Sequence, residues 1–302
     1  MSKVGVIMPL YNQNRRELTM ALMSLATQIY MDWKLVIVID GANDQTVQTL
    51  YDIMAKNEII REKITKVVYR SKNKGIANTV NEGMEEVKDC DYITWVSSDN
   101  LYYPQFLFVL SEALDNNPDC SIVYSNFDIF EHNRGKEVFM YNSPKHLSRA
   151  NRLDYIGANT DDGIETTAYK GFIGMTFMYR KTNERYNPTY ELVEDYEFFS
   201  RVMAEGNVGY VDEMLGAYRF GGSEAYTTKF GRRIREKHFI AMKEIIKRFE
   251  SGIYDGRVSK VVQTNRTLTA EQREKKVDWQ NFKPKLDAKL RETWFVPLNY
   301  ED

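Results

Sequence analysis

Lys3-Val4-Gly5-Val6-Ile7-Met8-Pro9-Leu10 is a nearly unbroken apolar stretch closed by proline and leucine, and it decides the fold class. A second stretch of the same texture, residues 34–39, is followed by Asp40. Continuous apolar runs of this length are typical of parallel strands that are covered on both faces. Between them, leucines recur within residues 17–28 at the spacing of one helical face. The sequence therefore predicts a strand, a helix and a second strand.

The same alternation continues along the chain. It predicts helices over residues 46–56 and 75–87, and strands over residues 66–69 and 92–96. Such a pattern favours an α/β fold with a parallel sheet and right-handed crossovers, in which ligands bind beyond the carboxyl ends of the strands. Polar residues follow three of the predicted strand ends, and we expect them to converge on one cleft: Tyr11, Asp40 and Asp99.

Several short motifs in this half of the chain carry a family resemblance. They are Pro9–Asn12, Ser24, Leu25 and Gln28, Val36–Asp44, Asn73–Ala77, Asn81 and Gly83. In order and spacing, across about 100 residues, they resemble the nucleotide-binding half of family 2 glycosyltransferases, which have the GT-A fold. The resemblance weakens beyond Asn126, returns at Gly171–Gly174 and Glu194–Glu197, and does not extend to the last 70 or so residues.

The resemblance implies a GT-A-type, Rossmann-like, mostly parallel sheet flanked by helices, with a helical C-terminal extension. We expect residues 1–125 to form the nucleotide-sugar-binding half, residues 126–225 the acceptor-binding half and residues 226–302 the extension. Residues 131–170 are rich in Asn, Gly, Asp and Ser, which predicts loops and short helices above the sheet.

Composition excludes some functions. The chain has 41 basic and 43 acidic residues, so overall charge gives no reason to expect binding to nucleic acid. Its two cysteines, Cys90 and Cys120, have no metal-ligand spacing and indicate a reduced compartment. No leader and no apolar run near the ~20 residues of a membrane span is present. We expect a cytoplasmic protein, at most peripheral at the inner face of the membrane.

The C-terminal region is helical in pattern and locally basic. Residues 229–250 carry eight Lys or Arg against three Glu, together with an apolar face. A solvated surface helix is the simpler interpretation, and contact with a membrane surface is the alternative. A last helix is predicted over residues 283–294, which could dock on the catalytic domain or join two copies of the chain.

A nucleotide site is implied by the resemblance. Pro9, Tyr11 and Asp40 occupy positions at which the family holds uridine or a similar base. Asn12 offers an amide, and Lys74 could reach a phosphate. The alternative is that Pro9 ends a strand, Asp40 begins a turn and Lys74 is solvated.

A divalent cation, Mg²⁺ or Mn²⁺, normally assists departure of the diphosphate, because hard cations bind phosphate oxygens. The family usually offers Asp-x-Asp, whereas this chain has Ser97-Ser98-Asp99. The resemblance implies that Asp99 keeps the metal-binding position, and that Ser97 and Ser98 belong to the nucleotide-sugar site. A helix or turn cap is the alternative role for Asp99.

A second departure from the family pattern lies downstream. Many relatives place a histidine shortly after a Tyr-Arg pair, but Tyr218 and Arg219 are followed by Phe220 and two glycines. The three histidines are scattered: His132, His146 and His238. Arg219 or Lys229 is the alternative cationic partner of the diphosphate.

The predicted catalytic pair is Glu194 and Asp195. The resemblance implies that Asp195 deprotonates the acceptor hydroxyl, and adjacent carboxylates should raise one pKa, which suits a base. The alternative is that these acids only complement the dipole of the helix that they begin. Gly171 to Gly174 would form a backbone floor beneath sugar and acceptor, with Gly174 and Glu194 at the acceptor.

These residues predict an inverting, hexosyltransferase-like enzyme. It would move a sugar from a nucleotide diphosphate sugar, with UDP favoured, to a glycan, lipid-linked or protein acceptor in polysaccharide or glycoconjugate synthesis. The altered motif at Ser97 motivates an alternative, a nucleotide-sugar-binding protein with impaired catalysis. A nucleotidyltransferase would need a basic, glycine-rich phosphate loop after the first strand, and Tyr11–Asn14 is not one.

Overall fold

The computed structural model describes residues 2–133, 136–142, 173–220, 226–251, 261–263 and 278–293. The strands are β1 (Val4–Leu10), β2 (Trp33–Asp40), β3 (Ile64–Arg70), β4 (Tyr92–Trp95), β5 (Leu101–Tyr102), β6 (Cys120–Asn133), β7 (Lys136–Asn142), β8 (Phe177–Arg180), β9 (Asn207–Phe220) and β10 (Val261–Gln263). The helices are α1 (Arg15–Leu25), α2 (Asp44–Lys56), α3 (Glu58–Lys63), α4 (Ile76–Glu86), α5 (Phe106–Asn116), α7 (Glu194–Val202), α8 (Tyr226–Glu250) and α10 (Trp279–Thr293), with a 3₁₀ turn at Pro188–Tyr190.

All of these strands belong to one mixed sheet in the order β10-β9-β6-β8-β4-β1-β2-β3, with β5 beside β9 and β7 beside β6. Strands β1 to β4 are mutually parallel, β8 is antiparallel to both of its neighbours, and β6, β9 and β10 are again parallel. The predicted α/β, mostly parallel sheet flanked by helices is confirmed.

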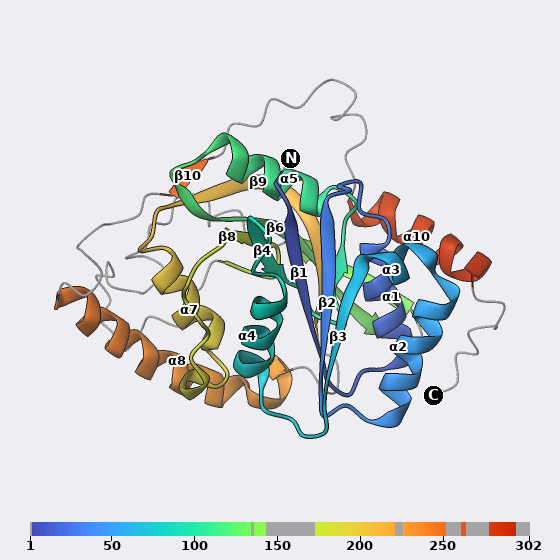
Figure 1. Cartoon of the computed structure of the whole chain (residues 1–302), viewed down its shortest axis with the longest axis horizontal. Helices are drawn as coiled ribbons and strands as arrows, with labels where there is room; N and C mark the ends of the chain where they lie inside the picture. The colour runs from blue at the N-terminus through green and yellow to red at the C-terminus, as the bar shows by residue number, and fades with distance from the viewer. Residues whose placement is uncertain are drawn as a thin grey trace.

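The central strands are buried on both faces, as their apolar runs predict. Along β2, Leu35, Ile37 and Ile39 face one hydrophobic cluster, and Val36 and Val38 face another. The first cluster includes α1, α2 and α5, and the second includes α4, α7 and α8. Figure 1 shows α1 and α2 on one side of the sheet and α4, α7 and α8 on the other.

Helix α10 covers part of the sheet that the other helices leave uncovered. Its apolar side packs with residues of α1, β5, β6 and β9 in a third cluster. The Trp279 ring lies 4.7 Å from the Phe130 ring, and the Phe282 ring lies 5.1 Å from Tyr103. The buried Asp128 carboxylate accepts hydrogen bonds from the Tyr103 hydroxyl and from the backbone N–H of Trp279, so it fixes the start of α10.

Helix α8 is held on α7 by a buried ionic network. The Glu197 side chain is 1% exposed and accepts from Arg201 at 2.8 and 2.9 Å and from Arg248 of α8 at 3.2 Å. The Tyr190 hydroxyl donates to Glu244 at 2.5 Å and accepts from Arg248 at 2.8 Å. The predicted basic helix therefore directs part of its charge toward the catalytic domain.

One expectation for the region after β6 is wrong. Residues 131–170 were expected to form loops and short helices, but β6 continues to Asn133 and β7 pairs with it antiparallel. Residues 143–170 lie outside the described residues. The expected division at 125/126 falls within β6, and β10 adds to the same sheet from within residues 226–302.

Candidate active site

The carboxyl edge of β1, β2 and β4 brings three predicted residues together. Strand β1 lies between β2 and β4 and is parallel to both, so their carboxyl ends share the edge opposite the N-terminus in Figure 1. Tyr11 follows β1, Asp40 ends β2 and Asp99 follows β4. Pro9 is the second-last residue of β1. The Tyr11 side chain is 49% exposed, which leaves its ring free to contact a base.

Asp40 is 4% exposed and organises the neighbouring loop. Its carboxylate accepts from the backbone N–H of Lys74 at 2.9 Å and of Gly75 at 3.0 Å, and it pairs with Arg70 at 3.3 Å. Gly41 has φ +70, and a Cβ there would lie 2.5 Å from the backbone nitrogen of Asn73. A carboxylate has about four lone-pair sites, so Asp40 retains capacity for a nucleotide. Its contact with a base stays a prediction.

Two other predicted residues are placed by backbone contacts. The Asn12 side-chain oxygen accepts from the backbone N–H of Asn43 at 2.8 Å, which ties the loop after β1 to the start of α2. Lys74 is exposed and gives its backbone N–H to Asp40, so only its ammonium remains for a phosphate.

The Ser97–Asn100 loop is held from three sides. The Ser97 N–H donates to the buried Tyr102 hydroxyl at 2.9 Å, and the Ser98 hydroxyl donates to Gln13 at 3.1 Å. The Asn100 side-chain oxygen accepts from the backbone N–H of Arg219 at 3.0 Å. Burial raises the pKa of Asp99 to about 6, with Arg219 acting to lower it and the nearby Glu17 carboxylate acting to raise it. A cation beside Asp99 would stabilise its charged form.

Glu194 and Asp195 begin α7, and Leu192, two residues before the helix, has the unusual φ of +78 for a residue with a side chain. Burial and then the charge of Asp195 raise the pKa of Glu194 to about 8. Burial also raises the pKa of Asp195, although its carboxylate accepts from the N–H of Tyr196 at 2.7 Å. The expected shift is present, and removal from water is its largest cause.

The acid pair lies near the carboxyl end of β4. The Trp95 indole at that strand end donates to the Tyr186 hydroxyl at 2.9 Å. Burial raises the pKa of Tyr186 well above its usual value, and the nearby Asp195 carboxylate contributes to the same direction. Asn81 of α4 exchanges two hydrogen bonds with the Tyr186 backbone, which anchors this segment. One strand end thus links the Asp99 loop to the predicted base.

Other predicted site residues are only partly described. Gly174 lies against the Phe127 ring, where any Cβ would overlap a ring carbon. Gly171 and Phe172 lie outside the described residues, as does His146. For Lys229, His132 and His238 only the backbone is described, so their predicted roles are not addressed.

Two residues at this edge, Gln13 and Glu17, were not predicted as part of the site. Gln13 accepts from Ser98 and donates to Glu17 at 2.5 Å, and Glu17 lies 3.6 Å from the Arg219 guanidinium. Glu17 is an acidic residue in the first turn of a helix, which is a common position for acids, so the sequence did not indicate that it belongs to a site.

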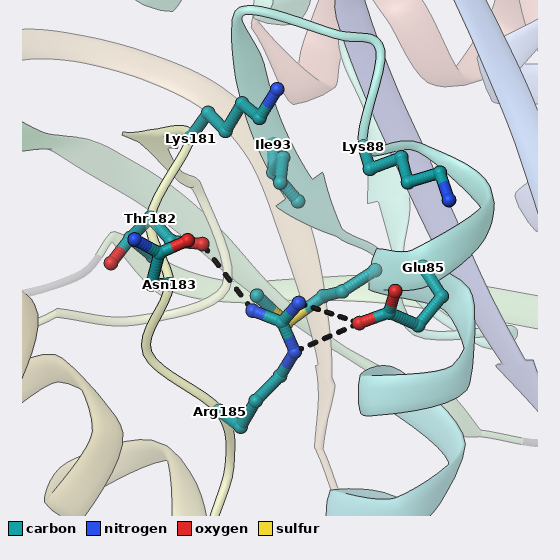
Figure 2. A pocket seen from close by; sticks show the side chains of 8 residues that line it. Glu85, Lys88, Ile93, Lys181, Thr182, Asn183 and Arg185 are labelled. Carbon is teal, nitrogen blue, oxygen red and sulfur yellow. Dashed lines mark hydrogen bonds and ion pairs between the residues drawn. The ribbon is translucent and has the colours of Figure 1, made fainter.

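A pocket lies away from these residues. Its volume is about 250 Å³, and it lies between α4, the start of β4 and the segment after β8. Arg185 binds Glu85 there at 2.5 and 3.2 Å, and Figure 2 shows this pair among the lining residues. Ile93, near the amino end of β4, belongs to its lining. The pocket is therefore at the opposite edge of the sheet, and none of the predicted site residues lines it.

The donor set at Asp99 fits a cation that is bound together with its substrate. Within the described ranges, no group of three or more His, Cys, Asp or Glu could enclose a metal ion. Magnesium commonly binds through one or two carboxylates and completes its shell with phosphate oxygens and water. Asp99 supplies one partly exposed carboxylate, which would hold such a cation in its deprotonated form.

The sequence matches the model of glycosyl transferase family 2 over residues 5–200, and the chain belongs to this family. An uncharacterised glycosyltransferase of Haemophilus influenzae is 25% identical over 159 residues, which are 52% of this chain and 56% of that protein. The chain thus spans about half of that relative, and less of some others.

Solved structures show the same fold. S. aureus TarS 1-349, in complex with UDP, has a TM-score of 0.53 and 19% identity over 82% of this chain and 72% of TarS 1-349. The mannosyltransferase PcManGT from Pyrobaculum calidifontis, in complex with GDP-Man and Mn²⁺, has a TM-score of 0.54 and 14% identity over 85% of this chain and 66% of PcManGT. Both likenesses support the GT-A fold.

Across the helices that the structure describes, none is both long and apolar enough to cross a membrane.

Proposed function

We propose that this glycosyltransferase is an inverting, hexosyltransferase-like enzyme that transfers a sugar from UDP-sugar to an acceptor hydroxyl in polysaccharide or glycoconjugate synthesis. The observation that carries the proposal is the grouping of the Asp99 loop and the Glu194–Asp195 pair around the carboxyl end of β4. In this proposal the Asp99 loop forms the nucleotide side of the site, and the acid pair forms its acceptor side.

The roles follow from the chemistry of direct displacement. Asp195 accepts the proton of the acceptor hydroxyl as its oxygen bonds to the anomeric carbon, and the bond from that carbon to the diphosphate breaks on the opposite face. Tyr11 and Asp40 hold the base and ribose. Mg²⁺ or Mn²⁺ bound at Asp99 would neutralise charge on the departing diphosphate. The UDP complex of TarS favours a uridine nucleotide, and the GDP-Man complex of PcManGT keeps a guanosine nucleotide as the alternative.

A thermal-shift screen of nucleotide sugars tests this function, since a ligand that binds only the folded state raises stability. Stabilisation by one nucleotide sugar, followed by release of its nucleotide with a matching acceptor, is the expected result. Stabilisation without turnover on any glycan, lipid-linked or protein acceptor would favour the alternative, a nucleotide-sugar-binding protein with impaired catalysis, which Ser97 motivates.

The Asp40→Ala substitution should weaken binding of the nucleoside diphosphate by roughly 1 to 3 kcal/mol, the usual effect of losing a hydrogen bond at a buried polar site. Calorimetry with UDP and GDP measures it. Because Asp40 also holds the Lys74 and Gly75 amides, Arg70→Lys is the control that disturbs the same loop but keeps the carboxylate. Unchanged affinity for every nucleotide would remove Asp40 from the site.

Turnover should require Mg²⁺ or Mn²⁺, while the cation alone should bind weakly, because Asp99 offers one carboxylate and phosphate oxygens must complete the shell. Calorimetric titration of Mn²⁺ with and without UDP tests the second part. Assays of turnover in chelator, followed by addition of metal, test whether turnover requires the cation. Added metal should restore turnover in the wild-type protein but not in Asp99→Asn. Full turnover in excess chelator would contradict the prediction.

A further inference from the structure

Arg219 is the most confined cation at the carboxyl edge of the sheet. Its side chain is 3% exposed, and its guanidinium carbon lies 4.8 Å from the centre of the Phe130 ring, as in a cation–π contact. Its backbone N–H donates to Asn100, and its Nε donates to the backbone carbonyl of Asp99 at 3.2 Å. These contacts fix the guanidinium beside the loop that carries Asp99.

The outer part of the same guanidinium has no acceptor among the residues that the structure describes. Nη1 and Nη2 are both buried, and neither makes a hydrogen bond with any group that the structure describes. The carboxylate of Glu17, which is the paired charge, lies 3.6 Å from Nε, beyond the range of a good hydrogen bond. Leaving charged donors unsatisfied in a buried site is costly, so this arrangement suits a ligand rich in acceptors.

The position of these donors selects the ligand chemistry. Because Nε of the same guanidinium donates to the Asp99 carbonyl, Nη1 and Nη2 lie close to the loop of Ser97 to Asn100, which carries residues of the predicted nucleotide-sugar site. The planar guanidinium presents paired N–H groups that match phosphate oxygens, and such charge-assisted pairs are stronger than neutral hydrogen bonds. A nucleoside or a neutral sugar would supply weaker acceptors and no opposite charge.

We propose that Nη1 and Nη2 of Arg219 bind the diphosphate of the nucleotide sugar, so that Arg219 is a resident cation for the leaving group. This inference rests on the proposed function and deepens it. As the bond from the anomeric carbon to the diphosphate breaks, its electron pair stays on the phosphate oxygen, and Arg219 stabilises that charge. Arg219 acts on the diphosphate in addition to any cation at Asp99, and its contribution persists in chelator.

Calorimetry in excess chelator tests the proposal, with uridine, UDP, guanosine and GDP as probes on the full chain. Arg219→Gln should weaken binding of the diphosphate by about tenfold or more and leave binding of the matching nucleoside unchanged, since only the phosphates lose a partner. Equal loss for nucleoside and diphosphate, or no loss for either, would overturn it.

Two further variants keep the test decisive. Arg180→Gln removes another partly buried guanidinium, which binds carbonyls at and just after the end of α5, and should retain wild-type affinity for the diphosphate. Arg219→Lys keeps the charge but not the paired donors, so it should lose several-fold in affinity even if Arg219→Gln fails to fold. Wild-type affinity in Arg219→Lys would overturn the proposal in that case. If the wild-type chain binds neither UDP nor GDP, both the Arg219 proposal and the proposed function are wrong.

Discussion

Asp195→Asn should lower transfer by about 10² to 10⁴-fold, the range that general base catalysis supplies, while affinity for the nucleotide sugar persists. The substitution keeps the shape of the side chain but removes the proton acceptor. Because burial raises the pKa of Asp195 above the ordinary value of 3.8, the acid limb of the wild-type kcat/KM profile should lie above that pH. Turnover falls as pH falls through this pKa, since the protonated side chain is no base.

The matched control is the neighbouring change, Glu194→Gln, which should cost less transfer. Steady-state assays across pH, together with calorimetry of the nucleotide sugar, separate loss of chemistry from loss of binding. If Asp195→Asn turns over at the wild-type rate with the true acceptor, the base assignment is wrong. Glu194, whose pKa is raised to about 8, and then Glu191 become the next candidates.

Glu197→Ala should lower the free energy of unfolding by about 3 kcal/mol, because removal of one partner of a buried ionic network leaves charge uncompensated. The carboxylate is 1% exposed and joins Arg201 of α7 to Arg248 of α8. Its loss weakens both the helix that begins with the predicted base and the contact with the C-terminal extension. Chemical denaturation of the full-length variant measures the effect.

Glu85→Ala is the control for this prediction. Glu85 pairs with Arg185 at 2.5 Å, but both side chains are exposed to solvent, and such surface pairs contribute little. Its free energy of unfolding should therefore stay close to that of the wild-type protein. If the two variants unfold alike, Glu197 does not hold α8 on α7.

Local sequence patterns predicted the core of the fold. The apolar runs ending at Leu10 and Asp40 form β1 and β2, because strands covered on both faces need apolar residues at successive positions. Pairings between distant segments were not visible. β6 pairs with β9 through a register that shifts at several points, and β7 lies in a region whose polar residues indicated loops. The sequence of one strand does not indicate which distant strand pairs with it.

The sequence predicted which residues of the site lie at strand ends, but it did not predict the contacts between them. The rule for parallel sheets located Tyr11, Asp40 and Asp99, since it depends only on where each strand stops. The hydrogen bond from Ser98 to Gln13 joins residues 85 positions apart, and the bond from Arg219 to Asp99 spans 120 positions. Such contacts depend on tertiary packing, which cannot be predicted from the spacing of residues along the sequence.

The Phe130 ring links two regions that are remote in sequence. One of its contacts is Trp279 at the start of α10, and another is the guanidinium of Arg219. If the docking of α10 changes how this ring supports Arg219, thermodynamic linkage requires a ligand at Arg219 to change the docking of α10 by the same factor. A single aromatic ring thus separates the C-terminal extension from the guanidinium that we propose for the leaving group.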